Sequence, residues 1–423
     1  MNDKVVLIIA YYFPPMGLSG VQRIIKFVKY LPEFGWKPII LTDTPSSFYA
    51  FDETLFLDLN NPAIEVFRTR NKKAEREDQK PKIVKLPSYF IQKIGRAVLQ
   101  TFYMPDSKIK WKKHAIELGK KLISKYKPDV ILATAPPYTD FMIASELSAA
   151  FDVPFIVDYR DPWLDNPFHF FATPFHKSYS EKLERDILTH ANKAIVVSRG
   201  IKEQLVKRYG FISHNDIAII SHGYDPDDFA QLAHVKPNPY KFTITHSGVF
   251  QDNRTPKFFL KALSSFIART PGAGNEIEAR FIGVTRKTHQ KLIKRYGLSG
   301  NVVSTGYVSH LENVRYLLES DVLWLMQFDT ARTPGKLFEY FGAGKPILAS
   351  VPDGIIKKLA LDTKAAIATA PEDVSAIEQA IETFYKLWKN NNLPKPKTDF
   401  VEQFNRRTLT SELARELELA REI

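Results

Sequence analysis

The residues best suited to chemistry lie in the segment 334–349, which follows the apolar run 322–326. Lys336 and Glu339 stand three residues apart there, behind Pro334 and ahead of a Gly-rich stop. That spacing puts both side chains on one face of a predicted helix. A helix N-terminus beside a lysine favours an anion such as phosphate, and a carboxylate one turn further along can accept hydrogen bonds from sugar hydroxyls. The pair suits a nucleotide or nucleotide-sugar, although an ordinary amphipathic helix capped by glycine fits the pattern too.

A second cation stands after another predicted strand. The segment 247–256 follows the strand predicted at Phe242–Ser247, and it contains Gly248 and Arg254. Arg254 and Lys336 together would present two positive charges to a leaving group that gains negative charge, and such preorganised charge stabilises the transition state. Two cations would also take the place of a metal ion. An arginine in a surface turn is the alternative.

Two more clusters follow predicted strands in the first half of the chain, where ligands of parallel sheets usually bind. One is a small-residue loop whose backbone N–H groups could approach a diphosphate. It is not G-x-G-x-x-G and so does not indicate a nicotinamide cofactor; a plain tight turn is the alternative. The other is a group of ionisable residues after a strand predicted at 153–157, which a structural Asp–Arg pair would also explain. The loop residues are Gly17, Ser19 and Gly20, and the ionisable ones are Asp158, Arg160 and Asp161.

The pattern of strand, loop and helix repeats along the chain and predicts an α/β fold with parallel sheets and right-handed crossovers. The early strands are predicted at 4–11, 38–42 and 63–68, and the later ones include 322–326, 346–349 and 366–369. A linker rich in Pro and Lys at 235–241 separates two such series. The sequence therefore predicts two Rossmann-like domains, at residues 1–222 and 223–399, with a final helix at 400–423.

Composition limits the possible classes. The chain has 423 residues, 44% of them hydrophobic and 25% charged, as expected for a globular protein of two domains. It has no Cys, which excludes disulfides and thiolate sites. The apolar run 5–13 is too short to span a bilayer, so we interpret it as a strand rather than a signal peptide.

The net charge of +12 is concentrated in one stretch. Residues 81–127 hold twelve Lys and Arg against two acids, interleaved with aromatic residues such as Phe102, Tyr103 and Trp111. This mixture favours an anionic membrane surface or an anionic polymer. No motif for nucleic-acid binding accompanies it, so we expect no nucleic-acid partner. A solvated helix face is the alternative.

The segment around Glu339 resembles the donor-site motif of GT-B glycosyltransferases, in particular the retaining family 4, the glycogen-synthase-like group. The family pattern is E-x7-E, with Lys three residues before the second Glu and a G-x-P-V strand after it. Eight residues before Glu339, where the family has its first Glu, this chain has Ala331. Because of that departure, the contact that the family makes with the hexose of the donor is not implied for this chain. The contacts with the nucleotide part of the donor are still implied. The matching residues are Lys336, Glu339, Gly344, Lys345 and Pro346.

Other segments extend the resemblance over nearly the whole chain. Residues 158–163 resemble a D-(F/Y)-R-D-P-W subgroup that acts on bacterial cell-surface polysaccharides, and Arg23 matches the Arg of a G-G-x-x-R loop. The resemblance implies that Asp161 contacts the donor sugar or the acceptor hydroxyl, and that Arg160 positions that group or the acceptor phosphate. It also implies that Arg254 and Lys336 bind the diphosphate of the donor. In similar enzymes the last helix crosses back to the first domain. Further implied substrate contacts, including a nucleobase turn at 307–308, are Asp158, Gly248, Tyr307, Val308, Gly335, Leu337 and Glu339.

The resemblance thus implies a GT-B fold, with two doubly wound domains facing a central cleft, and a metal-independent, retaining glycosyltransferase. UDP- or GDP-sugar would be the donor substrate, with no cofactor. The acceptor would be a polyprenyl-linked or other cell-surface glycan bound by the first domain. We expect a cytoplasmic protein, peripheral at the inner face of the cell membrane.

Two other functions stay open on the sequence. One is a GT-B epimerase or phosphorylase, although no Schiff-base lysine of a pyridoxal phosphorylase is singled out. The other is a non-catalytic binding protein, made conceivable by Ala331. The D-x-D string at 225–227 and the scattered histidines lack the context of a metal site, so we assign them no metal.

Overall fold

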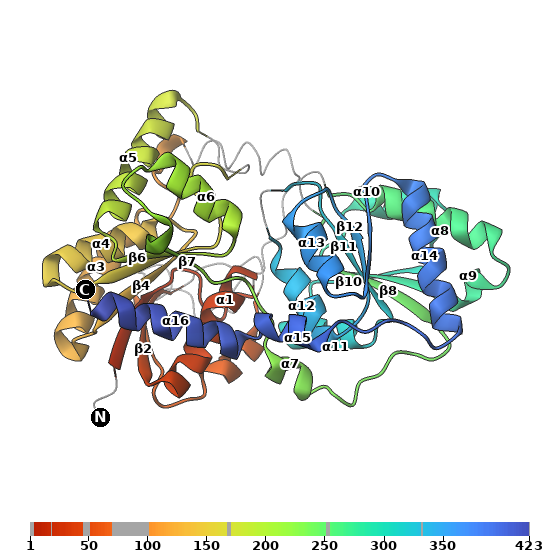
Figure 1. Cartoon of the computed structure of the whole chain (residues 1–423), viewed down its shortest axis with the longest axis horizontal. Helices are drawn as coiled ribbons and strands as arrows, with labels where there is room; N and C mark the ends of the chain where they lie inside the picture. The colour runs from red at the N-terminus through yellow and green to blue at the C-terminus, as the bar shows by residue number, and fades with distance from the viewer. Residues whose placement is uncertain are drawn as a thin grey trace, which may run out of the picture. The chain divides into compact units, whose positions relative to one another are not determined.

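The computed structural model describes residues 4–17, 19–44, 51–69, 101–166, 171–250, 254–330 and 333–422. The chain forms two compact units, and each is an α/β domain (Figure 1). Unit 1 comprises residues 1–221 and 406–423, and unit 2 comprises residues 222–405. The predicted division differs from this one at His222 and at residues 400–405, which belong to unit 2. Residues 91–100, where the sequence pattern predicts a helix, and Ala331 lie outside the described residues.

Unit 1 is built on a parallel sheet in the order β3-β2-β1-β4-β5-β6-β7. Most residues of its strands are apolar, as a sheet covered on both faces requires. β7 was not predicted, because it has only three residues and its last one is exposed. The strands are β1 (Lys4–Ile9), β2 (Trp36–Asp43), β3 (Glu65–Thr69), β4 (Val130–Ala135), β5 (Phe155–Tyr159), β6 (Lys193–Val196) and β7 (Ile217–Ile219).

Helices cover both faces of this sheet. One core lies between the sheet and α3 to α6, and the other between the sheet and α1 with α16. The helices are α1 (Ser19–Tyr30), α3 (Trp111–Tyr126), α4 (Thr139–Phe151), α5 (Pro174–His190), α6 (Arg199–Arg208) and α16 (Arg406–Arg421), with short 3-10 turns η1 (Leu31–Phe34), η2 (Glu53–Leu59) and η4 (His214–Asp216).

The single helix predicted at 400–423 is wrong. The segment forms α15 (Thr398–Val401), η5 (Glu402–Phe404) and then α16, with Asn405 extended between them. Phe400 and Phe404 pack in a core of unit 2, whereas Leu409 and Leu413 pack in unit 1. The break exists because one stretch of chain serves two cores, and the chain thereby returns to the first unit.

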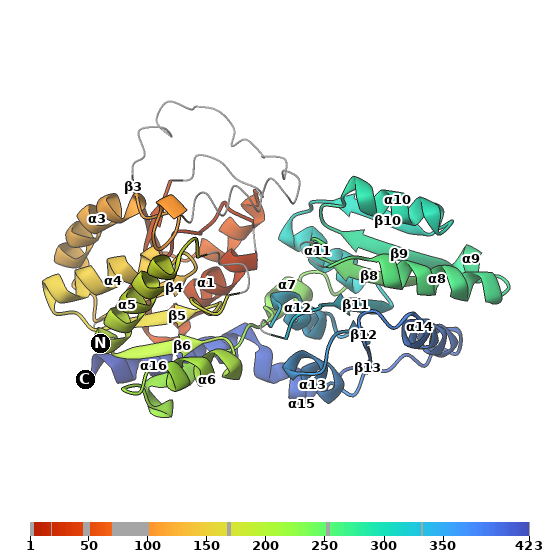
Figure 2. The same ribbon diagram turned by 90° about the horizontal axis from the view of Figure 1, so that it is seen from above.

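Unit 2 is built on a second parallel sheet, in the order β10-β9-β8-β11-β12-β13 (Figure 2). Its strand order reverses between β8 and β11, and that of unit 1 between β1 and β4. Ligands of such sheets bind beyond the strand ends at these reversals. The strands are β8 (Phe242–Ser247), β9 (Ile277–Ile282), β10 (Val302–Gly306), β11 (Val322–Met326), β12 (Ile347–Ser350) and β13 (Ala366–Thr369).

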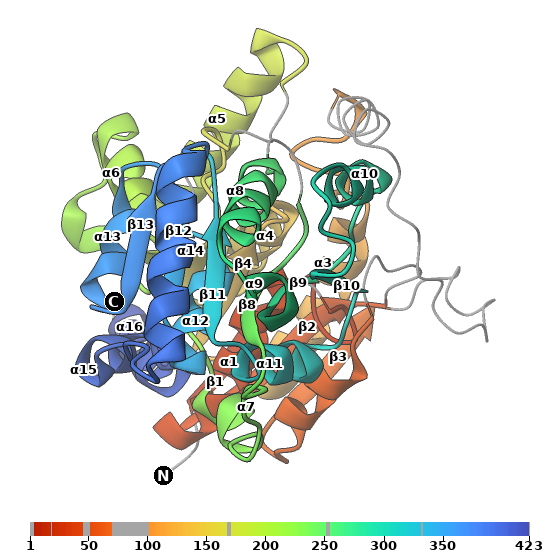
Figure 3. The ribbon, with the colours of Figure 1, turned by 90° about the vertical axis from the view of Figure 1, so that its right-hand side faces the viewer.

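Helices α8 and α14 lie on one face of this sheet (Figure 3), and α12 and α13 form the core on the other. Gly344 ends α12 with φ +63°, as the Gly-rich stop predicted. The helices are α7 (Pro226–Ala230), α8 (Lys257–Arg269), α9 (Ala273–Glu276), α10 (Lys287–Arg295), α11 (His310–Leu318), α12 (Gly335–Ala343), α13 (Ile355–Asp362) and α14 (Val374–Lys389).

Candidate functional site

The N-terminus of α12 lies at the strand reversal of unit 2. The helix follows β11, and β8 is the neighbouring strand. Pro334 occupies the N-cap position, and its side chain makes no hydrogen bond to the first backbone N–H groups of the helix. Lys336 is in the first turn. An N-terminus that combines backbone N–H groups, the positive end of the helix dipole and an ammonium group is suited to an anion.

Lys336 is partly buried, against Gly248, which directly follows β8. A Cβ atom added at Gly248 would lie 2.8 Å from Lys336 Nζ, and Gly248 has φ +115°, so only glycine fits there without strain. Burial, and then the positive charge of Arg254, lower the pKa of Lys336 to about 7, although the charge of Glu339 opposes both. The structure therefore brings together the two cations that the sequence predicted as a pair.

His246, next to the end of β8, contacts Lys336 as well. Its Nδ1 lies 2.9 Å from the carbonyl oxygen of Trp324, and its Nε2 lies 3.3 Å from Lys336 Nζ. Burial, and then the charge of Lys336, hold the pKa of His246 well below its ordinary value. From the sequence we considered the histidines only as metal ligands and missed this contact. The position of His246 in the strand that leads into a loop assigned to an anion, two residues before Gly248, was the available signal.

Glu339 is held by residues of α11. Its Oε2 accepts a hydrogen bond from Asn313 Nδ2 at 3.1 Å, and Asn313 Oδ1 accepts one from Ser247 Oγ at 2.7 Å. Its Oε1 lies 4.0 Å from His310 Nδ1, while His310 Nε2 lies 2.8 Å from Asp228 Oδ2. The side chain of Glu339 is 21% exposed, so it can reach a ligand as well as its protein partners. Sequence reasoning did not identify Asn313 or His310.

The remaining predicted residues of unit 2 differ in exposure. Tyr307, directly after β10, is 40% exposed, and Val308 is partly buried. Gly335 has open space where a side chain would point. Leu337 is fully buried in the core around α12. A ligand would therefore meet Leu337 through its backbone, because its side chain is committed to packing.

In unit 1 the predicted residues Gly20 and Arg160 lie in contact. The buried guanidinium of Arg160 donates hydrogen bonds to the carbonyl oxygens of Gly20, Ala135 and Pro136. Arg160 thus joins the first turn of α1, which begins at Ser19 after the loop with Gly17, to the end of β4 and the loop that follows it. These contacts give Arg160 a structural role, although through backbone carbonyls rather than the Asp–Arg pair considered from the sequence. Its contact with a substrate stays a prediction.

Asp158 is engaged in a buried ion pair. Its carboxylate accepts hydrogen bonds from Arg23 Nη2 at 2.8 Å and from Thr134 Oγ1 at 2.8 Å. Nearby, Tyr138 stacks on Trp163 with ring centroids 4.3 Å apart, and its hydroxyl donates to the carbonyl oxygen of Asp161 at 3.2 Å. These contacts join the segment 135–138 to the segment 158–163.

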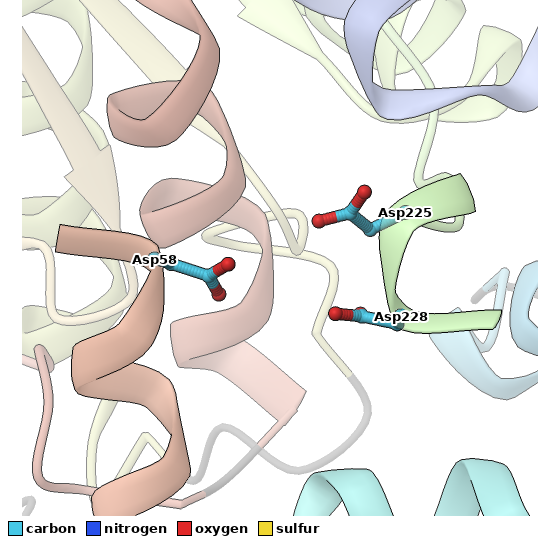
Figure 4. Close-up of side chains that lie close together, drawn as sticks. All are labelled: Asp58, Asp225 and Asp228. Atoms are coloured by element: carbon cyan, nitrogen blue, oxygen red, sulfur yellow. The ribbon is translucent and has the colours of Figure 1, made fainter. Parts of the chain in front are cut away.

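The D-x-D string has a local structural role. Asp225 is the N-cap of α7 and accepts a hydrogen bond from the backbone N–H of Asp227 at 3.1 Å. Asp225 and Asp228 both project from this short helix (Figure 4). Asp58, the third residue labelled in Figure 4, belongs to unit 1 and pairs with Lys26 at 2.8 Å. We assign no metal to these carboxylates.

Part of the basic stretch 81–127 is described, from residue 101 on. Lys108 Nζ lies 4.7 Å from the ring centroid of Tyr11, and burial lowers its pKa. Lys112 pairs with Glu146 at 2.8 Å. Phe102, by contrast, is 77% exposed. Among the helices that the structure describes, none is long and apolar enough to cross a bilayer.

Two family models match this chain. Residues 20–228 match the family model described as Glycosyltransferase Family 4, and residues 228–398 match Glycosyl transferases group 1. Together the two models span most of the chain. A comparison of the sequence with curated proteins found no match.

Solved structures share the fold of the whole chain. A sucrose-phosphate synthase from Thermosynechococcus elongatus is 15% identical, with 98% of each chain covered and a TM-score of 0.64. A glycosyltransferase from Rickettsia africae is 15% identical, with 99% of each chain covered and a TM-score of 0.62. Anabaena HepE in complex with UDP and glucose is 14% identical, with 98% of this chain and 99% of that one covered and a TM-score of 0.63. These neighbours place the two α/β domains in the GT-B fold.

Proposed function

We propose that this chain, which belongs to the glycosyltransferases of the GT-B fold, moves a sugar from a UDP- or GDP-sugar to a glycan acceptor without a metal ion. One observation carries the proposal. Lys336, next to Arg254, stands at the N-terminus of α12 directly over Gly248, at the strand reversal of unit 2. Two partly buried cations, one of which lies over a glycine that leaves room for it, fit a diphosphate.

Each group would have a separate task in donor binding. The ammonium of Lys336 and the guanidinium of Arg254 would hold the diphosphate, together with the N–H groups of the first turn of α12. As the glycosidic bond breaks, negative charge grows on the leaving diphosphate, and the two fixed cations stabilise it. Glu339, three residues further along the helix, would accept hydrogen bonds from the ribose hydroxyls. Tyr307 and Val308 would border the base.

The finer mechanism is also part of the proposal. We assign Asp161 to the donor sugar or the acceptor hydroxyl, and we expect retention of anomeric configuration, by resemblance to family 4 and its D-Y-R-D-P-W subgroup. Proton NMR of the first product would test retention, because the anomeric coupling constant distinguishes the two outcomes. A product of opposite configuration to the donor would contradict it.

The acceptor is proposed to be polyprenyl-linked or another cell-surface glycan, reached at an anionic membrane from the cytoplasmic side. The basic residues of the stretch 101–127 and the exposed ring of Phe102 support this. UDP is favoured among the nucleotides by the Anabaena neighbour, which was solved with UDP and glucose.

The proposed function is tested with a panel of nucleotide-sugars. Native mass spectrometry identifies which of them the protein binds, and a coupled assay measures nucleotide release with and without a lipid-linked glycan fraction. A transferase releases nucleotide faster when acceptor is present and attaches the sugar to it. An epimerase would change the donor without an acceptor, a phosphorylase would require phosphate, and a binding protein would release nothing.

A further inference from the structure

We propose that His246 is a positioning residue for Lys336, acting as a neutral hydrogen-bond acceptor that holds the ammonium group over Gly248. This inference rests on the proposed function, since it supposes that the ammonium over Gly248 is the one that meets the diphosphate. Nothing in the family resemblance assigns a role to His246.

The tautomer of His246 follows from its two contacts. The partner of Nδ1, 2.9 Å away, is the carbonyl oxygen of Trp324, which can only accept. Nδ1 therefore carries the proton, and Nε2 of a neutral ring has a free lone pair. That lone pair faces Lys336 Nζ at 3.3 Å. The ammonium group donates, and the imidazole accepts.

The ring cannot easily leave this orientation. It is 1% exposed and stacks on Phe250 with centroids 4.5 Å apart and planes 12° apart. The ring centroid of Trp324 lies 5.1 Å from that of His246. Lys336, on its other side, is limited by Gly248, where an added Cβ would come within 2.8 Å of Nζ. Both members of the pair are fixed by packing.

The charges around Lys336 explain why a neutral acceptor is useful. Burial and the charge of Arg254 disfavour the ammonium form of Lys336, and the charge of Glu339 favours it. A second carboxylate close to Nζ would also favour it, but would repel a diphosphate. A neutral imidazole supports the ammonium group without adding negative charge. Because its pKa lies well below the ordinary value, His246 stays neutral at working pH.

The central variant is His246→Phe, which keeps a flat ring against Phe250 but removes the acceptor. His289→Phe is the matched control, because His289 is also buried and its ring also lies against Phe250, with centroids 5.3 Å apart. His246→Gln restores an acceptor oxygen. If His246→Phe does not fold, His246→Met serves instead, since it resembles Gln in size and lacks the acceptor. Thermal melting checks the fold of each variant.

Calorimetry of UDP and GDP binding between pH 5.5 and 9 is the first readout. We expect His246→Phe to bind about tenfold more weakly at pH 7. Its loss of affinity with rising pH should begin about one pH unit lower than in the unaltered protein, because the ammonium form has lost its acceptor. His246→Gln should recover most of the affinity, and His289→Phe should match the unaltered protein. The terminal phosphate also titrates in this range, but equally for all variants.

The second readout is the titration of Lys336 itself, followed by NMR of protein labelled at the lysine side chains and assigned with Lys336→Ala. A fall in the pKa of Lys336 by about one unit in His246→Phe supports the inference even if no nucleotide binds, and the proposed function alone would then fail. An unchanged Lys336 titration overturns the inference. So does a loss of affinity that is the same at every pH and is not restored by His246→Gln, because a merely structural role would produce it.

Discussion

The side-chain amide of Asn313 fixes Glu339: Nδ2 donates to Oε2 at 3.1 Å, while its own oxygen accepts from Ser247 Oγ at 2.7 Å. The amide orientation is therefore set from both sides. Ser247 ends β8, Asn313 lies on α11 and Glu339 on α12, so three elements of unit 2 determine where the carboxylate points.

Asn313→Asp should damage donor binding more than turnover. The new carboxylate would stand where the Asn313 amide donates its hydrogen bond, and it would repel the carboxylate of Glu339. Glu339 would therefore leave its position. We expect the KM for the nucleotide-sugar to rise about tenfold while kcat changes by less than about threefold, since the ribose is remote from the reacting carbon. Steady-state kinetics at varied donor concentration measures both. A collapse of kcat at constant KM would place this pair at the transferred sugar instead.

Glu339→Gln removes the charge but keeps the size of the side chain. An amide accepts hydrogen bonds from ribose hydroxyls less well than a carboxylate, so the KM for the donor should again rise more than kcat falls. Donor kinetics of Glu312→Gln, an exposed carboxylate on α11 paired with Arg315, provides the control. Equal kinetics for the two variants would remove Glu339 from the donor site.

Much of the site could be predicted because it is local in sequence. Lys336, Glu339 and the glycine that ends α12 lie within one short helix, and the strands β8, β11 and β13 have the predicted bounds. Periodicity and cap residues are properties of neighbours along the chain, so the sequence shows them directly.

The rest depends on contacts between distant segments. His246 meets Lys336 from 90 residues away, and Asn313 meets Glu339 from 26 residues away. The residues next to them in the sequence do not show which distant residue the fold brings into contact with each. The same holds for Arg160, whose ionisable side chain suggested chemistry but whose hydrogen bonds go to three backbone carbonyls.

A buried carboxyl of unit 1 makes stability depend on pH. Burial raises the pKa of Glu184 to about 7, although Tyr209 donates a hydrogen bond to it at 2.7 Å. A folded-state pKa above the unfolded value of about 4.3 favours the protonated form, so the folded state loses stability as pH rises from about 4.3 to 7. Glu184→Gln should therefore stabilise the protein at pH 8 by up to about 3 kcal/mol, with little effect at pH 4. Urea unfolding at both pH values measures this, and equal effects at the two would contradict it.

Membrane docking should depend on exposed basic residues. Lys108 lies against Tyr11 and Lys112 is paired, so the test variant changes the exposed Lys110, Lys113, Lys120 and Lys121 to Glu. Each basic residue near an anionic surface contributes about 1 kcal/mol, so co-sedimentation with anionic liposomes should be lost at low salt. The same number of charge reversals on α10, at Lys287, Lys291, Lys294 and Arg295, is the control. Equal binding to neutral liposomes, or equal loss in the control, would leave a soluble acceptor as the better hypothesis.

The most direct test of the account is nucleotide release from the preferred nucleotide-sugar, measured side by side for the unaltered protein, Lys336→Ala and Lys357→Ala. Lys357 is an exposed lysine of unit 2 that pairs with Asp353, so it controls for loss of a lysine away from the site. Removing Lys336 deletes a hydrogen bond to a charged group, which we expect to weaken binding of the nucleotide by about 1.5–3 kcal/mol and to lower kcat/KM for release by at least about tenfold. Lys357→Ala should behave as the unaltered protein. Release by Lys336→Ala at the unaltered rate, or no release from any nucleotide-sugar by the unaltered protein, would contradict the account.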